Sequence, residues 1–464
     1  MSNASTASSL HAFLRPSSIA IVGAGDRPTS SGGAVLRNLL KAKFKGRVVP
    51  VNPKGGQLLG MPVARSLAEV SPPCDLVVIV VRPDSILDVV QEAAETGHRN
   101  LLILPGGFAE AGEDGKARDA ALRSLCTQHG LNVAGPNCAG LIDLLDPDHP
   151  FAATFLRDLP RGGGAALISQ SGAIAEEAIA ASHRLGIPLG NVISVGNAMQ
   201  FGAAEYLEHL GSDEACKVIM LYAEALGDNG SFARVAKRVA ARKPVVALIG
   251  GRSDAGRAAA FRHTGSRAPS DAEAASFCRD AGIVRVTSLR ELLLAAKALA
   301  FHPGGIGRRV LLLSNSGGPG VLCTDRCMDE GLQLPPLPER LAKSLRALYP
   351  DEAVVANPLD LLADAREERF GDTLRAVVED GRAHFDAVLM IHVVPFMVDA
   401  DPVVDRLAEL AASAPLPLLH AMMGTLEQKD AWIRRMESAG VPMFDNVEDM
   451  AAAAGLLARR RDDS

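Results

Sequence analysis

A histidine and a glutamate each follow a predicted strand, and together they could transfer a phosphoryl group. His263 lies in the polar segment 262–266 (RHTGS), which we expect to be a loop. The imidazole of histidine is a nucleophile near neutral pH and can carry a phosphoryl group. Glu224 comes directly after the apolar run 218–222 and could fix the tautomer of that imidazole. The sequence therefore predicts His263 and Glu224 as catalytic residues.

A serine-rich turn could bind the phosphoryl group. Ser169, Gln170, Ser171 and Gly172 follow an apolar run and open an Ala-rich stretch. Free N–H groups at a helix N-terminus and two hydroxyls would converge there, which predicts a phosphate-binding site. Simple N-capping by serine is the alternative. The similar segment 314–317 (SNSG) is expected only to cap a helix, because no histidine motif follows it.

A glycine turn near the N-terminus predicts a site for a phosphate-containing nucleotide. Gly23 and Gly25 follow the apolar run 18–22, and Arg27 and Lys54 could contact phosphates. Proline stands at position 28, where a dinucleotide-binding motif needs glycine. The second predicted strand leads into Asn52-Pro53-Lys54, with no acidic residue for a ribose. An NAD(P)-dependent dehydrogenase is therefore disfavoured.

The elements that would position these residues form a βα pattern. Short apolar runs alternate with Ala-rich helical stretches such as 85–96, which is typical of parallel sheets. Segments 164–172, 243–251 and 281–300 resemble 309–317, 416–424 and 439–458 in the same order, which indicates a duplication. We expect an α/β protein with a Rossmann-like domain (1–145) and two flavodoxin-like doubly wound parallel-sheet domains (146–303 and 304–464). The Pro- and Gly-rich stretch 146–164 shows no periodicity and is expected to be a connection.

The runs that we assign to strands are 18–22, 47–51, 76–81, 101–104, 131–134, 165–168, 192–195, 218–222, 245–249, 284–286 and 310–313.

The composition excludes several classes of protein. The 464 residues carry a formal net charge of -6 and only 4% aromatic residues, so binding to nucleic acid is not expected. No apolar run is long enough to span a membrane, and the N-terminus lacks a secretory signal. The seven cysteines include no CxxC pair, which favours free thiols, no metal site and a cytoplasmic location.

Seven motifs resemble those of one enzyme family, in family order along nearly the whole chain. They are VNPKGG (51–56), ILPGGF (103–108), GPNCAG (135–140), ISQSGA (168–173), LYAEAL (221–226), RHTGS (262–266) and NPLDL (357–361). The chain resembles the α subunit of NDP-forming acyl-CoA synthetases, such as ADP-forming acetate–CoA ligase, which are similar to succinate–CoA ligase.

The resemblance implies a reaction and a set of residues. Acyl-CoA, ADP and phosphate would be interconverted with carboxylic acid, ATP and CoA through acyl phosphate and phosphohistidine. His263 would carry the phosphoryl group, Glu224 would orient it, and the helix after Gly172 would cap the phosphohistidine. The first domain would bind coenzyme A through Gly23, Gly25, Arg27, Asn52, Lys54, Arg82, Pro105, Gly106 and Asn137.

The resemblance also implies a partner. The sequence has no P-loop and no region like an ATP-grasp domain, so a separate ATP-grasp β subunit would bind Mg-ADP or Mg-ATP in a hetero-oligomer. The third domain would serve assembly. Glu176 stands where succinate ligases carry an aromatic residue, which leaves the acyl group open. Two alternatives keep the fold without a phosphoryl relay: a CoA-binding regulatory module, and an acyl- or carbamoyl-transferring relative.

Overall fold

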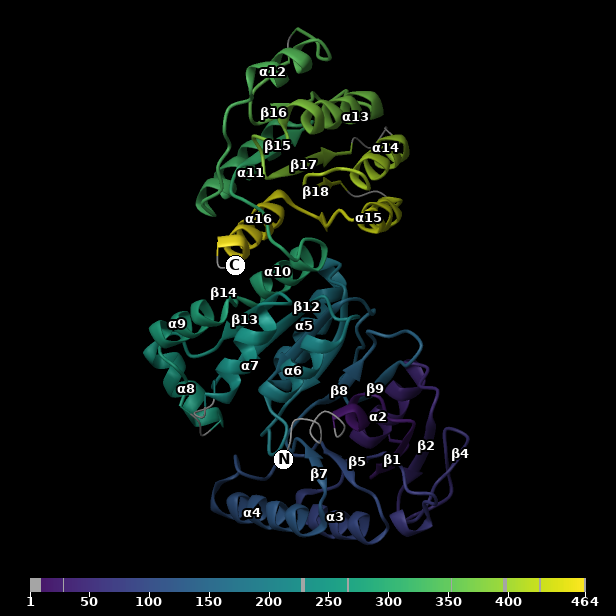
Figure 1. The fold of residues 1–464 in the computed structure, drawn as a ribbon. Coiled ribbons are helices and arrows are strands. Elements are labelled where there is room, and N and C mark those ends of the chain that lie inside the picture. Colours follow the sequence, from purple (N-terminus) through teal and green to yellow (C-terminus); the bar gives the residue numbers. More distant parts are fainter. Residues whose placement is uncertain are drawn as a thin grey trace. The chain divides into compact units, whose positions relative to one another are not determined.

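The chain folds into two compact units, Met1–Leu289 and Arg290–Ser464. The computed structural model describes residues 10–27, 29–226, 230–264, 267–351, 353–394, 399–424 and 427–462, and in helix α8 it describes side chains only as far as Arg262. Each unit consists of helices packed on parallel strands (Figure 1). Within the described residues, no helix has both the length and the apolar character needed to cross a lipid bilayer.

The first sheet of unit 1 holds five parallel strands in the order β2-β1-β5-β6-β7. A short antiparallel pair, β3 with β4, follows β2. The elements are β1 (Ser18–Val22), α2 (Ser31–Lys41), β2 (Arg47–Val51), β3 (Gln57–Leu58), β4 (Met61–Pro62), β5 (Leu76–Ile79), α3 (Ile86–Glu95), β6 (Asn100–Ile103), α4 (Gly112–His129) and β7 (Asn132–Ala134).

The second sheet of unit 1 has the order β14-β13-β12-β10-β11-β8-β9. Strands β10 to β14 are parallel, whereas β8 and β9 are antiparallel to their neighbours. The elements are β8 (Gly140–Asp143), β9 (Phe151–Thr154), β10 (Ala165–Ser169), α5 (Gly172–Leu185), β11 (Leu189–Ser194), α6 (Ala203–Ser212), β12 (Val218–Ala223), α7 (Ser231–Ala240), β13 (Val245–Ile249), α8 (Asp254–Thr264), α9 (Asp271–Ala281) and β14 (Val284–Val286).

The stretch 146–164 contains a strand that its sequence did not indicate. Strand β9 lies inside it and pairs with β8, which in turn pairs with β11 of the second sheet. All four residues of β9 are buried, so the run FAAT shows no alternation of apolar and polar residues. Asn38 of α2 donates hydrogen bonds of 2.8 Å to the carbonyls of Thr154 and Leu156. The expected connection thus fastens the first sheet's helices to the second sheet.

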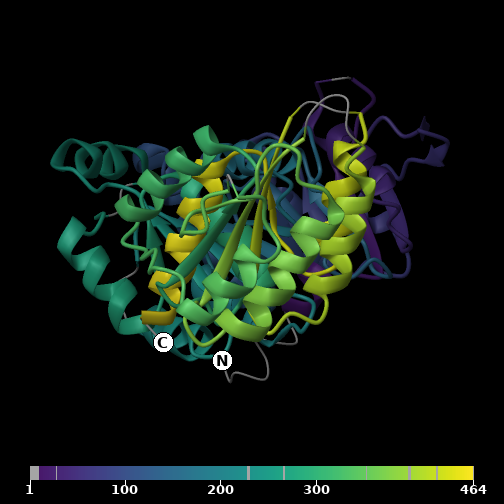
Figure 2. The same ribbon diagram turned by 90° about the horizontal axis from the view of Figure 1, so that it is seen from above.

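Unit 2 holds a third parallel sheet, in the order β16-β15-β17-β18-β19. Helices α13, α14 and α15 cover one face, and α11 and α16 pack together on the other (Figure 2). The elements are α10 (Leu289–Phe301), β15 (Val310–Ser314), α11 (Gly317–Asp329), α12 (Glu339–Arg346), β16 (Leu359–Asp360), α13 (Glu367–Ala376), β17 (Ala387–Val393), α14 (Asp401–Ala411), β18 (Leu418–Met423), α15 (Lys429–Ser438), β19 (Met443–Phe444) and α16 (Val447–Asp462).

The parallel strands of all three sheets follow one order, in which the first strand of the sheet lies between the second and the third. The second strand therefore lies on one side of the first strand, and the third strand lies on the other side. The position between the first and third strands is a topological switch point, and ligands bind above the carboxyl ends of the strands there. The switch points lie between β1 and β5, between β10 and β12, and between β15 and β17. Because all three sheets share this order, the predicted duplication of the second and third domains stays a prediction.

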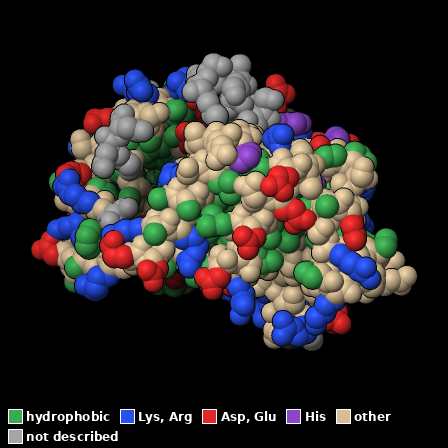
Figure 3. Space-filling model, turned by 90° about the horizontal axis from the view of Figure 1, so that it is seen from below, with side chains coloured by type: hydrophobic (Ala, Val, Ile, Leu, Met, Phe, Trp, Pro, Cys, Tyr) green, Lys and Arg blue, Asp and Glu red, His purple; other side chains and the backbone are tan. Residues whose placement is uncertain are grey.

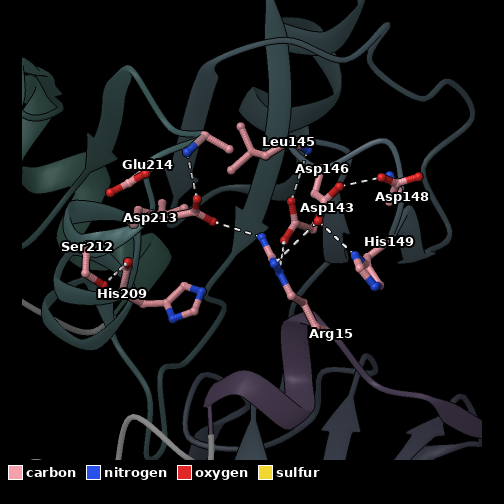
Figure 4. Close-up of polar contacts among 12 residues, drawn as sticks. Arg15, Asp143, Leu145, Asp146, Asp148, His149, His209, Ser212, Asp213 and Glu214 are labelled. Carbon is pink, nitrogen blue, oxygen red and sulfur yellow. Dashed lines mark hydrogen bonds and ion pairs between the residues drawn. The ribbon is translucent and has the colours of Figure 1, made fainter.

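One arginine joins three carboxylates at the junction of the two sheets in unit 1 (Figure 4). The Arg15 guanidinium lies 3.2 Å from Asp213, 3.6 Å from Asp146 and 3.9 Å from Asp143. Asp143 is buried at the end of β8, and its burial raises the pKa of its carboxyl, which the backbone N–H of Leu145 and the charge of Arg15 partly offset. Arg15 therefore fastens the N-terminal helical turn to β8 and to the segment after α6.

Candidate functional site

A cleft of about 720 Å³ opens in unit 1 above the first sheet. Its walls come from the segments after β1, β5, β6 and β7, from the segment after β9, and from the first turns of α5. The lining residues are Gly23, Arg27, Thr29, Ser30, Ser31, Gly32, Val80, Val81, Arg82, Leu104, Pro105, Gly106, Asn137, Cys138, Ala139, Phe155, Leu156, Gly172, Ala173 and Glu176. The cleft thus joins the switch point of the first sheet to the helix that follows β10.

The turn after β1 brings backbone close to the cleft. Gly23 has φ +95°, and a Cβ there would lie 2.4 Å from the carbonyl oxygen of Val80. A Cβ on Gly32 would lie 2.3 Å from the carbonyl oxygen of Gly23, so only glycine lets the turn pack on α2. The Ser30 hydroxyl caps α2 by accepting a hydrogen bond from the N–H of Gly33 at 3.2 Å. The free N–H groups of this helix start and the nearby Arg27 suit an anion.

Six of the nine residues predicted to bind coenzyme A line this cleft. They are Gly23, Arg27, Arg82, Pro105, Gly106 and Asn137. Gly25, Asn52 and Lys54 do not line it. Asn52 instead supports the glycine turn, because its side-chain amide donates to the Ala24 carbonyl at 2.8 Å. Lys54 is exposed beside it, and its backbone N–H donates to the Asn52 side chain at 3.1 Å.

The serine turn after β10 uses its hydroxyls within the turn. The buried Ser169 hydroxyl donates to the Ser171 carbonyl at 2.7 Å and accepts from the Ser171 N–H at 3.1 Å. The Ser171 hydroxyl accepts from the N–H of Ile174 at 3.3 Å and so caps α5. Of the four predicted phosphate-binding residues, only Gly172 lines the cleft. The turn therefore caps α5, which was the alternative interpretation. Phosphate binding by this turn stays a prediction.

Gln170 holds the predicted catalytic residue Glu224 at the switch point between β10 and β12. Its side-chain oxygen accepts from the N–H groups of Glu224 at 2.5 Å and Ala225 at 3.1 Å. The Tyr222 hydroxyl donates to the Glu224 carboxylate at 3.0 Å, and burial and the Glu224 charge raise the pKa of Tyr222. The tyrosine therefore stays a neutral donor to the buried Glu224, which is only 8% exposed. Sequence reasoning missed this tyrosine.

The predicted phosphohistidine lies on a helix rather than in a loop. Helix α8 spans Asp254–Thr264, so the backbone of His263 belongs to its last turn. The run of alanines and an arginine before it favours the helix over a loop. The side chain of His263 and the whole of Gly265 and Ser266 lie outside the described residues.

A carboxylate that sequence reasoning did not single out holds three loops together beside the cleft. Glu110 accepts from the N–H groups of Gly107 at 2.5 Å and Phe108 at 3.2 Å. It also accepts from the side-chain amide of Asn197 at 2.5 Å, and Asn197 accepts from the amide of Asn137 at 3.1 Å. These three side chains join the segments after β6, β7 and β11. A carboxylate soon after the Gly-Gly pair at 106–107 was the available signal.

The cleft suits an anionic ligand that also has an apolar part. Two arginines line it against one carboxylate, Glu176, and Phe155 and Leu156 add an apolar wall. Cys138 also lines it, but burial raises the pKa of its thiol to about 12, so the thiol is neutral and a poor nucleophile. On the face drawn in Figure 3, acidic and basic side chains are interspersed. Among the described residues, no group of three or more His, Cys, Asp or Glu side chains could hold a metal ion.

Three family models match successive parts of the chain. The CoA binding domain matches residues 17–143, the succinyl-CoA ligase like flavodoxin domain matches residues 162–299, and the ligase-CoA domain matches residues 310–455. The first two cover the parts of unit 1 that form the cleft, apart from Phe155 and Leu156, which lie between the matched ranges.

Relatives match the chain from end to end. It is 33% identical to the acetate–CoA ligase (ADP-forming) II subunit alpha of Pyrococcus furiosus, over 97% of both chains. It is also 33% identical to the acetate–CoA ligase (ADP-forming) I of Archaeoglobus fulgidus, over 96% of this chain but 62% of that longer protein.

A solved structure has the same fold over almost its full length. The dinucleotide-forming acetyl-coenzyme A synthetase 1 of Candidatus Korarchaeum cryptofilum, in complex with phosphate and ADP, superposes with a TM-score of 0.87. The match covers 98% of this chain and 97% of that chain at 28% identity. Together with the cleft and the three matched domains, these likenesses show that the chain belongs to the family of ADP-forming acetate–CoA ligase α subunits.

Proposed function

We propose that this chain is the α subunit of an ADP-forming acyl-CoA synthetase. It would interconvert acyl-CoA, ADP and phosphate with a carboxylic acid, ATP and CoA. One observation carries the proposal: a single cleft joins the glycine turn after β1, suited to the phosphates of CoA, to the start of α5, suited to a phosphoryl group. This cleft would bring together the two groups that must react.

The residues of the cleft fit coenzyme A as a substrate. The tight packing of Gly23 and Gly32 leaves room for a pyrophosphate against the start of α2, and Arg27 and Arg82 supply positive charge. The cleft then passes Gly106 and Asn137 toward Gly172. A thioester on an arm that follows this path would end at the start of α5, where phosphate would attack it.

The proposed reaction proceeds through an acyl phosphate and a phosphohistidine. Phosphate attacks the thioester carbonyl, which gives an acyl phosphate and releases CoA as thiol. The imidazole of His263 then takes the phosphoryl group, which releases the carboxylate, and passes it to ADP. Glu224, held by Tyr222 and Gln170, would orient the imidazole. The serine turn at 169–172 would stabilise the phosphohistidine through the N–H groups of α5.

The remaining assignments concern partners and domains. An ATP-grasp β subunit would bind the Mg-nucleotide and complete a hetero-oligomer; the subunit name of the Pyrococcus furiosus relative supports a partner chain. Residues 1–145 would bind CoA, 146–303 would carry the phosphohistidine, and 304–464 would serve assembly. The seven cysteines are free and buried, which supports a reducing, cytoplasmic location.

The proposal can be tested with the purified full-length chain and acetyl phosphate, which needs no nucleotide-binding partner. We expect a mass increase of one phosphoryl group that is labile in acid, stable in base and absent in His263→Ala. His149→Ala, at an exposed histidine paired with Asp146, is the matched control and should be phosphorylated like the wild type. Binding of CoA without any phosphorylation would instead favour a regulatory module or a transferase.

A further inference from the structure

The hydrogen bonds that link Glu110, Asn197 and Asn137 determine the orientation of the two asparagine side-chain amides. Glu110 already accepts two backbone N–H groups, and these bonds together with the one from Asn197 lower the pKa of its carboxyl against the opposing effect of burial. It is therefore a carboxylate near neutral pH and can only accept. Asn197 must turn its NH₂ group toward it.

The orientation of Asn197 in turn determines that of Asn137. With its NH₂ group on Glu110, Asn197 presents its oxygen to Asn137, and the Asn137 NH₂ group donates to it at 3.1 Å. The Asn137 oxygen then points to Gly106, because a Cβ built on that glycine would lie 2.9 Å from it. Both residues line the cleft. The described part of the chain provides no donor for this oxygen.

The backbone holds this arrangement rigidly. Asn137 has φ +59°, and its N–H donates to the Pro105 carbonyl at 2.9 Å. The N–H of Asn197 donates to the Pro136 carbonyl at 2.9 Å. A Cβ on Gly196 would lie 2.3 Å from that same carbonyl, so the two loops are in direct contact. The cleft therefore contains a preorganised hydrogen-bond acceptor.

The strand order places this acceptor along the cleft. Gly23 follows β1, and Asn137 follows β7, with β5 and β6 between them. Three strand spacings separate the two ends by about 14 Å. At the Asn137 end, Gly172 of α5 lies close, since a Cβ on Gly172 would be 3.1 Å from the Ala139 side chain. An arm that runs from a pyrophosphate at Gly23 along this edge of the sheet to Gly172 therefore passes Asn137.

We infer that Glu110 and Asn197 are positioning residues, which hold the Asn137 carboxamide so that its oxygen accepts a hydrogen bond from the pantetheine amide N–H nearest the sulfur of CoA. The inference rests on the proposed function for the identity of the ligand. It adds a specificity-determining contact near the thioester end, and two residues that do not touch the ligand but set the polarity of that contact.

Two ligands test the contact: CoA and an analogue in which the pantetheine amide N–H nearest the sulfur is replaced by an ester oxygen. Calorimetry on the full-length chain should give wild-type affinity for CoA about three- to tenfold above that for the analogue. Glu110→Gln should bring this ratio close to one, because a neutral amide no longer dictates the orientation of Asn197. Asn137→Gly should do the same, and glycine tolerates the positive φ.

The ratio is informative even where a variant is partly unfolded, since both ligands bind the same folded fraction. Glu113→Gln is the matched control, because Glu113 is exposed and, within the described ranges, pairs with Lys116 of the same helix alone; it should keep the wild-type ratio. A wild type that binds CoA and the ester analogue equally, or a Glu110→Gln variant with an unchanged ratio, overturns the inference alone. A wild type that binds neither ligand overturns the proposed function as well.

Discussion

At the residue scale, the predicted catalytic glutamate is held by two neighbours of different kinds. Gln170 fixes its backbone, and the Tyr222 hydroxyl fixes its carboxylate. Gly250 lies next to the Glu224 and Tyr222 side chains, since a Cβ there would be 3.4 Å from each of them. The Tyr222 hydroxyl is one of the groups that hold this carboxylate, and it can be removed without changing the shape of the ring.

Tyr222→Phe is expected to reduce turnover about tenfold, because a hydrogen bond to a charged group is lost while the ring remains. Steady-state kinetics with the partner subunit should show the loss in kcat rather than in KM for CoA, since Tyr222 does not line the cleft. Tyr349→Phe removes an equally hydrogen-bonded hydroxyl in unit 2 and should leave kcat unchanged. Equal kinetics for the two variants would contradict a role for Tyr222.

Glu176 places a negative charge in a cleft that we expect to bind polyanions. Glu176→Gln should therefore tighten CoA binding by about two- to fivefold at low ionic strength, with the gain shrinking as salt is added. Calorimetry at two salt concentrations measures both effects. Glu177→Gln is the control, because Glu177 pairs with Arg184 and does not line the cleft. Weaker CoA binding in Glu176→Gln would show that the carboxylate contacts the ligand favourably.

At the element scale, Arg15 neutralises part of an acidic junction that includes the buried Asp143. Arg15→Ala should lower the free energy of unfolding of unit 1 by about 2 kcal/mol at pH 7.5, because a buried carboxylate loses its partner. Burial holds the pKa of Asp143 above its usual value, so the folded state binds this proton more readily than the unfolded state. The loss should therefore be smaller at pH 5, which urea unfolding at both pH values would measure. A loss that is constant with pH would contradict this account.

Two histidines are buried on adjacent strands of unit 2 with little hydrogen bonding. His392 of β17 and His420 of β18 stack at 6.1 Å, and both ring nitrogens of His420 lack a partner among the described residues. Burial lowers the pKa of His392 to about 4 and, with the neighbouring His392, that of His420 to about 3. Both rings are therefore neutral in the folded unit.

The unfolded chain takes up these protons near pH 6.5, so unit 2 should lose stability as the pH falls below that value. His420→Leu removes one such proton uptake. Its stability relative to the wild type should rise by roughly 2 kcal/mol between pH 7.5 and pH 5. Urea titrations at the two pH values give this difference. No change with pH would show that His420 takes up a proton as readily in the folded state as in the unfolded chain.

At the scale of the whole molecule, each unit has apolar clusters of its own. The apolar cluster around Leu311, Val388 and Leu418 belongs to unit 2 alone, whereas those around Ile19 and Val77 belong to unit 1. Urea unfolding of the full chain should therefore show two transitions. Arg15→Ala should move only one of them and His420→Leu only the other. A single transition that both variants shift would show that the units unfold as one.

The sequence predicts most of the sheet scaffold, because buried parallel strands are continuous apolar runs. The predicted runs 18–22, 47–51 and 245–249 coincide with β1, β2 and β13. Strand β9 was not predicted, since four buried residues next to Pro and Gly show no periodicity. The helix at His263 was not predicted either, because the polar residues at its C-terminal end indicated a loop despite the alanines before them.

The candidate site was predictable where glycine or phosphate-binding motifs signal it, and not where contacts between distant loops create it. Gly23, Arg27 and Asn137 belong to motifs and line the cleft. Glu110 and Asn197 are 87 positions apart and become neighbours only through the packing of two sheets. The hydroxyls of Ser169 and Ser171 are hydrogen bonded within their own turn. These bonds depend on the backbone geometry of the turn, which the residue types alone do not determine.

The antiparallel pair β8 and β9 has a consequence for how a ligand enters and leaves. Strand β8 follows directly from the loop that carries Asn137, yet it is hydrogen bonded to β11 of the other sheet. The two walls of the cleft therefore cannot swing apart like a hinge without breaking a strand pairing. We therefore expect CoA to enter and leave through the open side of a cleft whose walls keep their positions. The residence time of CoA should then depend on its own contacts and not on how often the walls separate.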